Sequence, residues 1–160
     1  MPLYLVRHGE AYSEAADPDR SLTEAGKVTV DGMAQLATAF KIPVSQISHS
    51  GKTRARQTAD IFFNYLKPSA GVTEIKAINP YDDVIKIAPE LDPALNTMLV
   101  GHLPFMERLV SYLITGSPDK SIIKFQTGGI VCLDQIAKNE SWYIKSVSYT
   151  HLTLPTIYSV

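Results

Sequence analysis

An arginine and a histidine stand side by side at positions 7 and 8, directly after the apolar run Leu3–Val6 and directly before Gly9. A guanidinium group offers a planar fork of N–H donors that fits the oxygens of a phosphate. A neutral imidazole can attack phosphorus. The glycine lets the backbone turn sharply where a buried strand would end. Together, Arg7 and His8 predict a site for phosphoryl transfer.

Two later stretches carry the same kinds of side chain after predicted strands. Arg54 lies within Ser48–Thr58, and His102 lies within Val100–Pro104. The carboxyl ends of parallel strands meet at one edge of a sheet, where α/β proteins bind their ligands. Both stretches also lead into a helix, whose free N–H groups and positive dipole end favour an anion. We therefore expect four side chains to surround one tetrahedral anion: Arg7, His8, Arg54 and His102.

Other basic side chains fit structural roles better. Arg56 points away from Arg54 on a helix, which is typical of a surface charge. His49 lies on a strand and is expected to be structural, and His151 lies in a C-terminal stretch to which we assign no function. No set of Cys, His, Asp or Glu residues has the spacing of metal ligands, so the sequence predicts no metal and no cofactor.

The elements that must position these side chains alternate between strands and helices. A capping box at Ser21–Glu24 predicts a helix whose buried face comprises Ala25, Val28, Gly32, Met33, Leu36 and Phe40. Ser50 is expected to cap the second helix, and Pro104 to occupy the first position of the third. One or two helical turns are expected within Asp82–Leu91. The predicted strands are Leu3–Val6, Gln46–His49, residues 72–78, Thr97–Val100, Gly129–Asp134 and Trp142–Val147.

This order of elements predicts an α/β fold, a three-layer α/β/α sandwich with a mostly parallel central sheet. The last two strands are expected to form a closing hairpin. We expect one domain over residues 1–147. Residues 148–160 have no clear place in this architecture, so we interpret them as an extension of doubtful origin, either a frayed end or foreign sequence.

The charge balance excludes several classes of partner. The 160 residues include 15 basic and 16 acidic side chains and carry a net charge of −1, which gives no general attraction to nucleic acid or to an anionic membrane.

The single cysteine, Cys132, excludes an internal disulfide and sits in an apolar run typical of a buried, inert thiol. No signal-peptide pattern and no membrane-length apolar run is found, so we expect a cytoplasmic location. We also expect a monomer.

At its basic motifs the chain resembles the histidine phosphatase superfamily, the phosphoglycerate-mutase-like group, and within it the small bacterial phosphohistidine phosphatases of the SixA type. The resemblance covers Met1–Val147 and rests on four ordered motifs: Leu5–Glu10, Arg20–Gly26, Ser50–Thr58 and Val100–Pro104. It implies that His8 is the nucleophile and that the phosphoryl group is bound by Arg7, Arg54 and His102.

The chain departs from this family pattern at two places. Nothing after Val147 matches the family. Gly51 replaces the usual proline after Ser50, the serine that opens the Ser50–Thr58 motif. We expect this replacement to loosen the loop without removing Arg54.

The substrate class depends on how the leaving group receives a proton. A sugar or serine alkoxide leaves poorly without a proton donor. The acidic candidates between Arg54 and His102 are Asp83, which the resemblance favours, and Asp82, Glu74 and Glu90. Asp82 and Asp83 are also suited to cap the turn that follows them, so a catalytic role stays open. A phosphorylated imidazole leaves more readily, because its nitrogen titrates near neutral pH.

We therefore expect a phosphatase that works through a phosphohistidine intermediate and acts on phosphohistidine in a protein, such as a histidine-containing phosphotransfer protein. The segment before the third active-site strand is too short for a lid domain, and an open pocket suits a side chain presented by another protein. Two alternatives stay open: a small-molecule phosphomonoesterase on the same scaffold, and a non-catalytic module that binds phosphorylated side chains. The second alternative is disfavoured because a binding module could dispense with the nucleophile.

Overall fold

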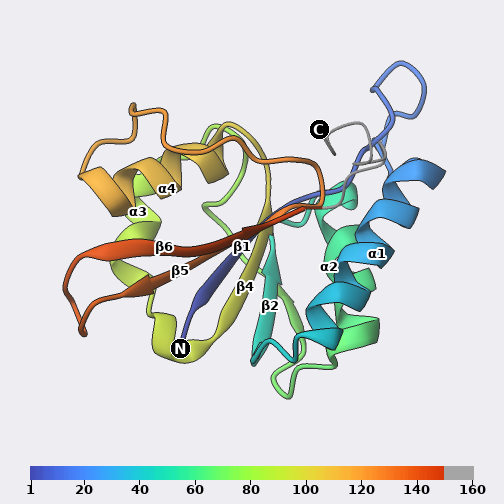
Figure 1. Ribbon diagram of the computed structural model, residues 1–160. Helices are drawn as coiled ribbons and strands as arrows, with labels where there is room; N and C mark the ends of the chain where they lie inside the picture. Colours follow the sequence, from blue (N-terminus) through green and yellow to red (C-terminus); the bar gives the residue numbers. More distant parts are fainter. Residues whose placement is uncertain (150–160) are drawn as a thin grey trace, which may run out of the picture.

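Six strands form one sheet in the spatial order β3-β2-β4-β1-β5-β6 (Figure 1). The computed structural model describes residues 1–149. β1, β4, β2 and β3 run parallel to one another, whereas β5 is antiparallel to β1 and β6 is antiparallel to β5. The mostly parallel sheet and its closing hairpin are thus confirmed. The strands are β1 (Leu3–Arg7), β2 (Gln46–His49), β3 (Val72–Glu74), β4 (Thr97–Gly101), β5 (Ile130–Gln135) and β6 (Trp142–Ser148).

Helices cover both faces of the sheet, which confirms the predicted three-layer architecture (Figure 1). α1 (Glu24–Ala39) and α2 (Thr53–Leu66) pack on one face. α3 (Val84–Ile87) and α4 (Phe105–Thr115) pack on the other, and α3 runs directly into a short 3₁₀ turn. The helical turns expected before β4 are therefore present.

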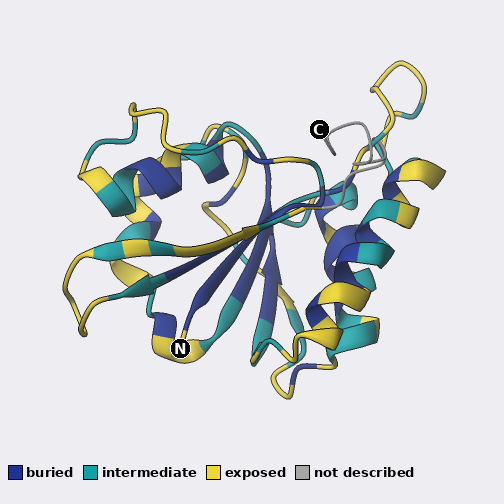
Figure 2. Cartoon of the chain, in the orientation of Figure 1, coloured by how far each residue is buried: buried dark blue, intermediate teal, exposed yellow. Residues whose placement is uncertain are grey.

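Alternating side chains of the central strands divide the core into two halves. Tyr4 and Val6 of β1 face α1 and α2, whereas Leu3 and Leu5 face α4. All four are buried, and the central strands form the most buried part of the molecule (Figure 2). Each fully buried apolar side chain contributes roughly 1.5–3 kcal/mol to folding. This two-sided core fixes the ends of β1 and β4 rigidly.

The buried face of α1 differs from the predicted one. Of the predicted residues only Met33 is buried, whereas Val28 is 68% exposed and Phe40 is 74% exposed. Helix α1 passes so close to the loop after β1 that a Cβ on Gly26 would lie 2.2 Å from the carbonyl oxygen of Glu10. This close approach selects the face that carries the glycine. The buried residues of α1 are Gly26, Val30, Met33, Ala34 and Ala37.

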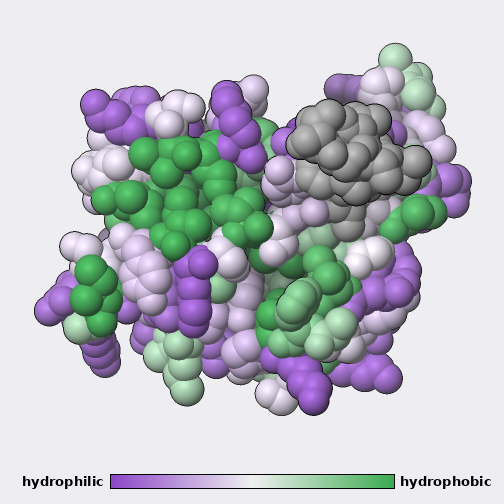
Figure 3. Space-filling view, viewed as in Figure 1, coloured by the Kyte–Doolittle hydropathy of each residue, from purple (hydrophilic) through white to green (hydrophobic). Residues whose placement is uncertain are grey.

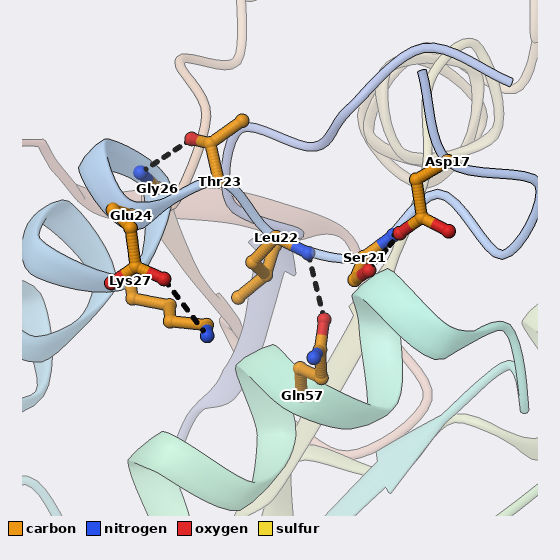
Figure 4. A network of polar contacts seen from close by, with 8 residues as sticks. All are labelled: Asp17, Ser21, Leu22, Thr23, Glu24, Gly26, Lys27 and Gln57. Atoms are coloured by element: carbon orange, nitrogen blue, oxygen red, sulfur yellow. Dashed lines mark hydrogen bonds and ion pairs between the residues drawn. The ribbon is translucent and has the colours of Figure 1, made fainter. Parts of the chain in front are cut away.

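The start of α1 corrects the predicted capping box. Thr23, not Ser21, caps the helix, and its Oγ1 accepts the Gly26 N–H at 2.9 Å (Figure 4). Ser21 instead donates its backbone N–H and its hydroxyl to Asp17. The Leu22 N–H donates to Oε1 of Gln57 at 2.7 Å, which ties this segment to α2. The loop after β1 is therefore anchored to both helices of its layer.

Two further boundaries differ slightly from the predictions. β3 spans only Val72–Glu74 rather than residues 72–78, and α4 begins at Phe105 with Pro104 as the preceding cap residue. β6 runs to Ser148, and the greater part of the predicted extension lies outside the described residues. Among residues 1–149, no helix has the length and apolarity that a membrane span requires.

An apolar hollow of about 310 Å³ lies between α1 and the β5–β6 hairpin, and Figure 3 shows apolar side chains gathered there. Its walls include Leu36, Phe40 and Cys132. Cys132 is buried, as the sequence predicts, and burial raises the pKa of its thiol. The hollow contains none of the four predicted site residues.

Candidate active site

The ends of β1 and β4 bring two histidines together. The two strands are parallel neighbours with Arg7 opposite Gly101, so His8 and His102 leave the sheet at the same level. The His8 N–H donates to the Gly101 carbonyl at 3.0 Å. The two imidazole rings lie with their centroids 5.0 Å apart and their planes inclined by 54°. The convergence of these two residues follows directly from the parallel pairing of the strands.

The first turn of α2 brings Arg54 to His8. The Nε–H of Arg54 donates to Nε2 of His8 at 3.3 Å. The charge of Arg7 also acts on His8 and lowers the pKa of its imidazole. All four side chains predicted to surround an anion therefore gather at this edge of the sheet.

Arg7 is held from the other side of the site. Its Nη1 donates to the Phe125 carbonyl at 3.0 Å, and the Phe125 N–H donates to Oε2 of Glu107 at 2.9 Å. The Nε of Arg7 is buried and has no hydrogen-bond partner among the described residues. A buried N–H without a partner is costly, and an oxyanion would satisfy it.

His8 is oriented by its neighbour in the chain. Its Nδ1 lies 2.7 Å from the Gly9 carbonyl oxygen. Because a carbonyl oxygen only accepts, Nδ1 carries the proton and Nε2 carries the lone pair. The Gly9 N–H in turn donates to Oγ1 of Thr58 at 3.0 Å, and the Thr58 hydroxyl donates to the Arg54 carbonyl at 2.8 Å. These contacts fix the backbone that aims Nε2.

The two imidazoles are neutral over the physiological pH range. Burial lowers the pKa of His8 to about 4, aided by the charges of Arg54, Arg7 and Arg20 and opposed by the hydrogen bond to Gly9. Burial also lowers the pKa of His102 to about 3, and the charge of His8 is the next cause. His102 is 1% exposed. A neutral imidazole with a free lone pair is the form that can attack phosphorus.

Ser50 is a site residue that the sequence interpretation missed. Its Oγ lies 2.5 Å from Nε2 of His102. It does not cap α2, which begins at Thr53 with Lys52 at the cap position. Nδ1 of His102 is buried without a hydrogen-bond partner among the described residues. The signal available in the sequence was the position of Ser50 at the end of β2, the strand next to β4.

Arg20 and Lys52 are two further cations near the site. Burial is the main cause of the lowered pKa of His8, His102 and Arg54, and the charge of Arg20 lowers each of them further. The charge of Lys52 also lowers the pKa of His102. Arg20 is held by the donation of its Nε–H to the Tyr12 carbonyl at 3.1 Å. Arg20 lies in a stretch that the sequence marks as a polar loop. Only its membership of the Arg20–Gly26 motif indicated that it would lie near the histidines.

The turn at Gly51 shows what replaces the expected proline. Gly51 has a φ of +90°, and its N–H donates to Nδ1 of His49 at 3.0 Å. Proline could form neither feature, because its φ is fixed near −65° and it lacks an N–H. His49 is buried and anchors this turn, in agreement with the structural role expected of it. Arg54 stays in place three residues later.

Asp82 and Asp83 lie outside the histidine cluster. Oδ2 of Asp82 accepts the Asn79 N–H at 2.8 Å, and Oδ1 of Asp83 accepts the Ile85 N–H at 2.9 Å, where Asp83 caps α3. Within residues 1–149, no hydrogen bond or ion pair joins either carboxylate to the four basic side chains. Both line a cavity of about 490 Å³ that also reaches Ser50. They are thus neighbours of the site rather than members of the cluster.

The remaining assignments concern surface charge and metals. Arg56 is exposed, as expected for a surface charge. In the described part of the chain, no group of three His, Cys, Asp or Glu side chains is placed to hold a metal ion. The cluster itself consists of imidazole and guanidinium groups, which suit an oxyanion.

Comparisons with known proteins find one matching family model and several solved structures of similar fold. Residues 3–79 match the family model of the histidine phosphatase superfamily, branch 1. The protein histidine phosphatase SixA, solved with tungstate, superposes with a TM-score of 0.80 at 23% identity, over 93% of this chain and 97% of that one. A candidate phosphohistidine phosphatase SixA from Agrobacterium tumefaciens gives 0.74 at 26% identity, with the same coverage of 93% and 97%.

A third solved structure is that of an enzyme named for a small-molecule substrate. The mycobacterial glucosyl-3-phosphoglycerate phosphatase, in complex with VO3, gives a TM-score of 0.71 at 14% identity, over 93% of this chain and 99% of that one. In a sequence comparison with curated proteins, none matches this chain. The fold is thus common to phosphatases with protein substrates and with small-molecule substrates.

Proposed function

Since the chain belongs to the histidine phosphatase superfamily, we propose that it is a phosphatase that removes the phosphoryl group of phosphohistidine on a protein, through a covalent intermediate on His8. One observation carries this proposal. Nδ1 of His8 is committed to the Gly9 carbonyl, which leaves the lone pair of Nε2 facing Arg54, a group that binds phosphate.

Binding begins when the phosphoryl oxygens replace the imidazole as acceptors. Arg54 exchanges its hydrogen bond with Nε2 of His8 for one with a phosphoryl oxygen, which frees the lone pair. Arg7 supplies the buried Nε–H that lacks a protein partner, and His102 supplies an imidazole N–H. The positive charges of Arg20 and Lys52 add to the field. Charge on the equatorial oxygens is then stabilised by groups that are already in position.

Two displacements at phosphorus complete the reaction. Nε2 of His8 forms a bond to phosphorus, and the bond from phosphorus to the substrate imidazole breaks, with its electron pair going to that nitrogen. The leaving nitrogen takes a proton from solvent water. Water then attacks the phosphorus of phospho-His8, the bond to Nε2 breaks, inorganic phosphate leaves and neutral His8 is restored.

The leaving group favours phosphohistidine over an alkyl ester. An imidazole leaves readily because its nitrogen titrates near neutral pH, whereas an alkoxide needs a strong proton donor. Asp82 and Asp83 are the proposed donors if one is used, although each is also engaged by a backbone N–H. A site with so little acid provision is better matched to the easier leaving group.

A small-molecule phosphomonoesterase is the second candidate. The cavity of about 490 Å³ beside Ser50 could hold a small leaving group, and the similar mycobacterial enzyme is a glucosyl-3-phosphoglycerate phosphatase. A non-catalytic binding module is disfavoured, because the aimed lone pair of His8 would serve no purpose in it. The cytoplasmic location and the monomeric state stay predictions.

Turnover measurements test the proposal. A histidine-containing phosphotransfer protein, phosphorylated on its histidine, is compared with a panel of sugar phosphates and nucleotides at equal concentration. We expect kcat/KM for the phosphoprotein to exceed that of every small ester, and His8→Ala to abolish both activities. Turnover of the small esters alone would assign the chain to the second candidate.

A further inference from the structure

A second cavity adjoins the phosphoryl site. It measures about 490 Å³, and its charged and polar walls include Ser50, Glu74, Lys76, Asp82, Asp83 and Lys86. Ser50 belongs to both places, because its hydroxyl contacts His102 and the residue also lines the cavity. A group attached to the phosphorus can therefore extend past Ser50 into this space.

Gly51 makes room for one of the carboxylates in this cavity. Glu74 ends β3 and is the register partner of His49, the last residue of β2. A Cβ on Gly51 would lie 2.6 Å from Cδ of Glu74 and 2.7 Å from its Oε2, so any other residue would push this carboxylate away. The glycine thus lets Glu74 pack against the loop that carries Ser50.

Two of the three carboxylates of the cavity are held by hydrogen bonds, whereas no hydrogen bond or ion pair within residues 1–149 holds the ammonium groups of its two lysines. Asp82 and Asp83 accept hydrogen bonds from the backbone N–H groups of Asn79 and Ile85, and the exposed Glu74 carboxylate lies against Gly51. Lys76 and Lys86 are exposed, and each carries its ammonium group at the end of a flexible four-carbon chain. Preorganised groups recognise a ligand at lower entropic cost than mobile ones. The cavity therefore presents two positioned carboxylates, with the Glu74 carboxylate against Gly51 as a third, beside a cluster of cations at the phosphoryl site.

We propose that this cavity binds a cationic side chain, a lysine or an arginine, that neighbours the phosphohistidine on the protein substrate. The assignment rests on the proposed function. A second phosphate or a carboxylate on the leaving group would instead meet Glu74, Asp82 and Asp83, and like charges at an interface are disfavoured. The site as a whole then selects a dipolar surface, with the phosphoryl anion at one end and a basic group at the other.

Phosphohistidine peptides of matched sequence test the assignment. Three peptides carry lysine, glutamine or glutamate on both sides of the phosphohistidine, and kcat/KM is measured for each at low salt. We expect lysine to exceed glutamate by about tenfold, with glutamine between them. Raising the salt to about 0.5 M is expected to shrink this ratio.

Variants of Glu74 locate the preference. In Glu74→Gln the lysine-to-glutamate ratio should fall about threefold, and in Glu74→Lys it should fall to one or below. Glu90→Gln is the matched control, because Glu90 is an exposed carboxylate that does not line the cavity. Its ratio should equal that of the unaltered protein. A ratio that is the same in Glu74→Lys as in the unaltered protein would overturn the assignment.

Aryl phosphates separate this assignment from the proposed function. Phenyl phosphate carrying an aminomethyl group is compared with phenyl phosphate carrying a carboxylate, in the unaltered protein and in Glu74→Lys. If no peptide is hydrolysed but the aminomethyl ester is preferred and Glu74→Lys removes that preference, the protein substrate is wrong and the cation site stands. If neither set of substrates is discriminated by charge, the cation site is wrong.

Discussion

Acidification should destabilise the protein through its two buried histidines. Both imidazoles are neutral in the folded state, with the pKa lowered from an ordinary 6.5 to about 4 for His8 and about 3 for His102. The unfolded chain therefore binds more protons than the folded protein between pH 6.5 and these values. Stability contributed by the neutral imidazoles is present above pH 6.5 and is lost as the pH falls toward 4.

The size of the effect follows from the distance to the ordinary pKa. A pH of 5 lies 1.5 units below the ordinary histidine pKa of 6.5, which applies in the unfolded chain. Each pH unit corresponds to about 1.36 kcal/mol. Lowering the pH from 7 to 5 should thus cost on the order of 2 kcal/mol for His8. This is a large fraction of the stability of a small domain.

Urea unfolding at pH 7 and at pH 5 measures this cost, with the single Trp142 as the fluorescence probe. Phosphate and sulfate are left out, because a bound anion would favour the protonated imidazoles. We expect the loss of unfolding free energy between the two pH values to be smaller by about 2 kcal/mol in His8→Asn than in the unaltered protein. An equal loss in both proteins would refute the assignment of a neutral, buried His8.

Three substitutions test the parts of the site separately. Arg54→Lys should lower kcat/KM about 100-fold or more, because an ammonium cannot reproduce the guanidinium fork; wild-type activity would remove Arg54 from the mechanism. Gly51→Pro should lower the unfolding free energy by about 3 kcal/mol, because proline removes the N–H that donates to Nδ1 of His49 and cannot adopt a φ of +90°. An unchanged urea midpoint would contradict this. Thr58→Val should lower the unfolding free energy by about 1–3 kcal/mol, because it leaves the Gly9 N–H unpaired, whereas Thr58→Ser should not.

The sequence predicts the layers and the convergence of the site because both follow from parallel strand order. Arg7, His8 and His102 stand at the ends of β1 and β4, so pairing these strands in register brings them together. Arg54 follows from the helix that begins after β2. No detailed knowledge of packing is needed for these positions.

The predictions that failed depend on close packing, which periodicity does not encode. Helix α1 has apolar residues on two adjacent stripes, and the approach of Gly26 to Glu10 decides between them. Ser50 has the residue type of a helix cap, but its hydroxyl contacts His102 of another strand. The partner of a hydroxyl group is set by tertiary distance, which a local pattern cannot supply.

Chemical identification of the covalent intermediate tests the central claim most directly. The protein is mixed with a ³²P-labelled phosphohistidine donor and quenched rapidly in alkali, and the label is then treated with acid and located by peptide mapping. The account predicts an acid-labile, base-stable label on His8 that is absent from His8→Ala. A label that persists in His8→Ala, that survives acid, or that never forms while substrate turns over would contradict it.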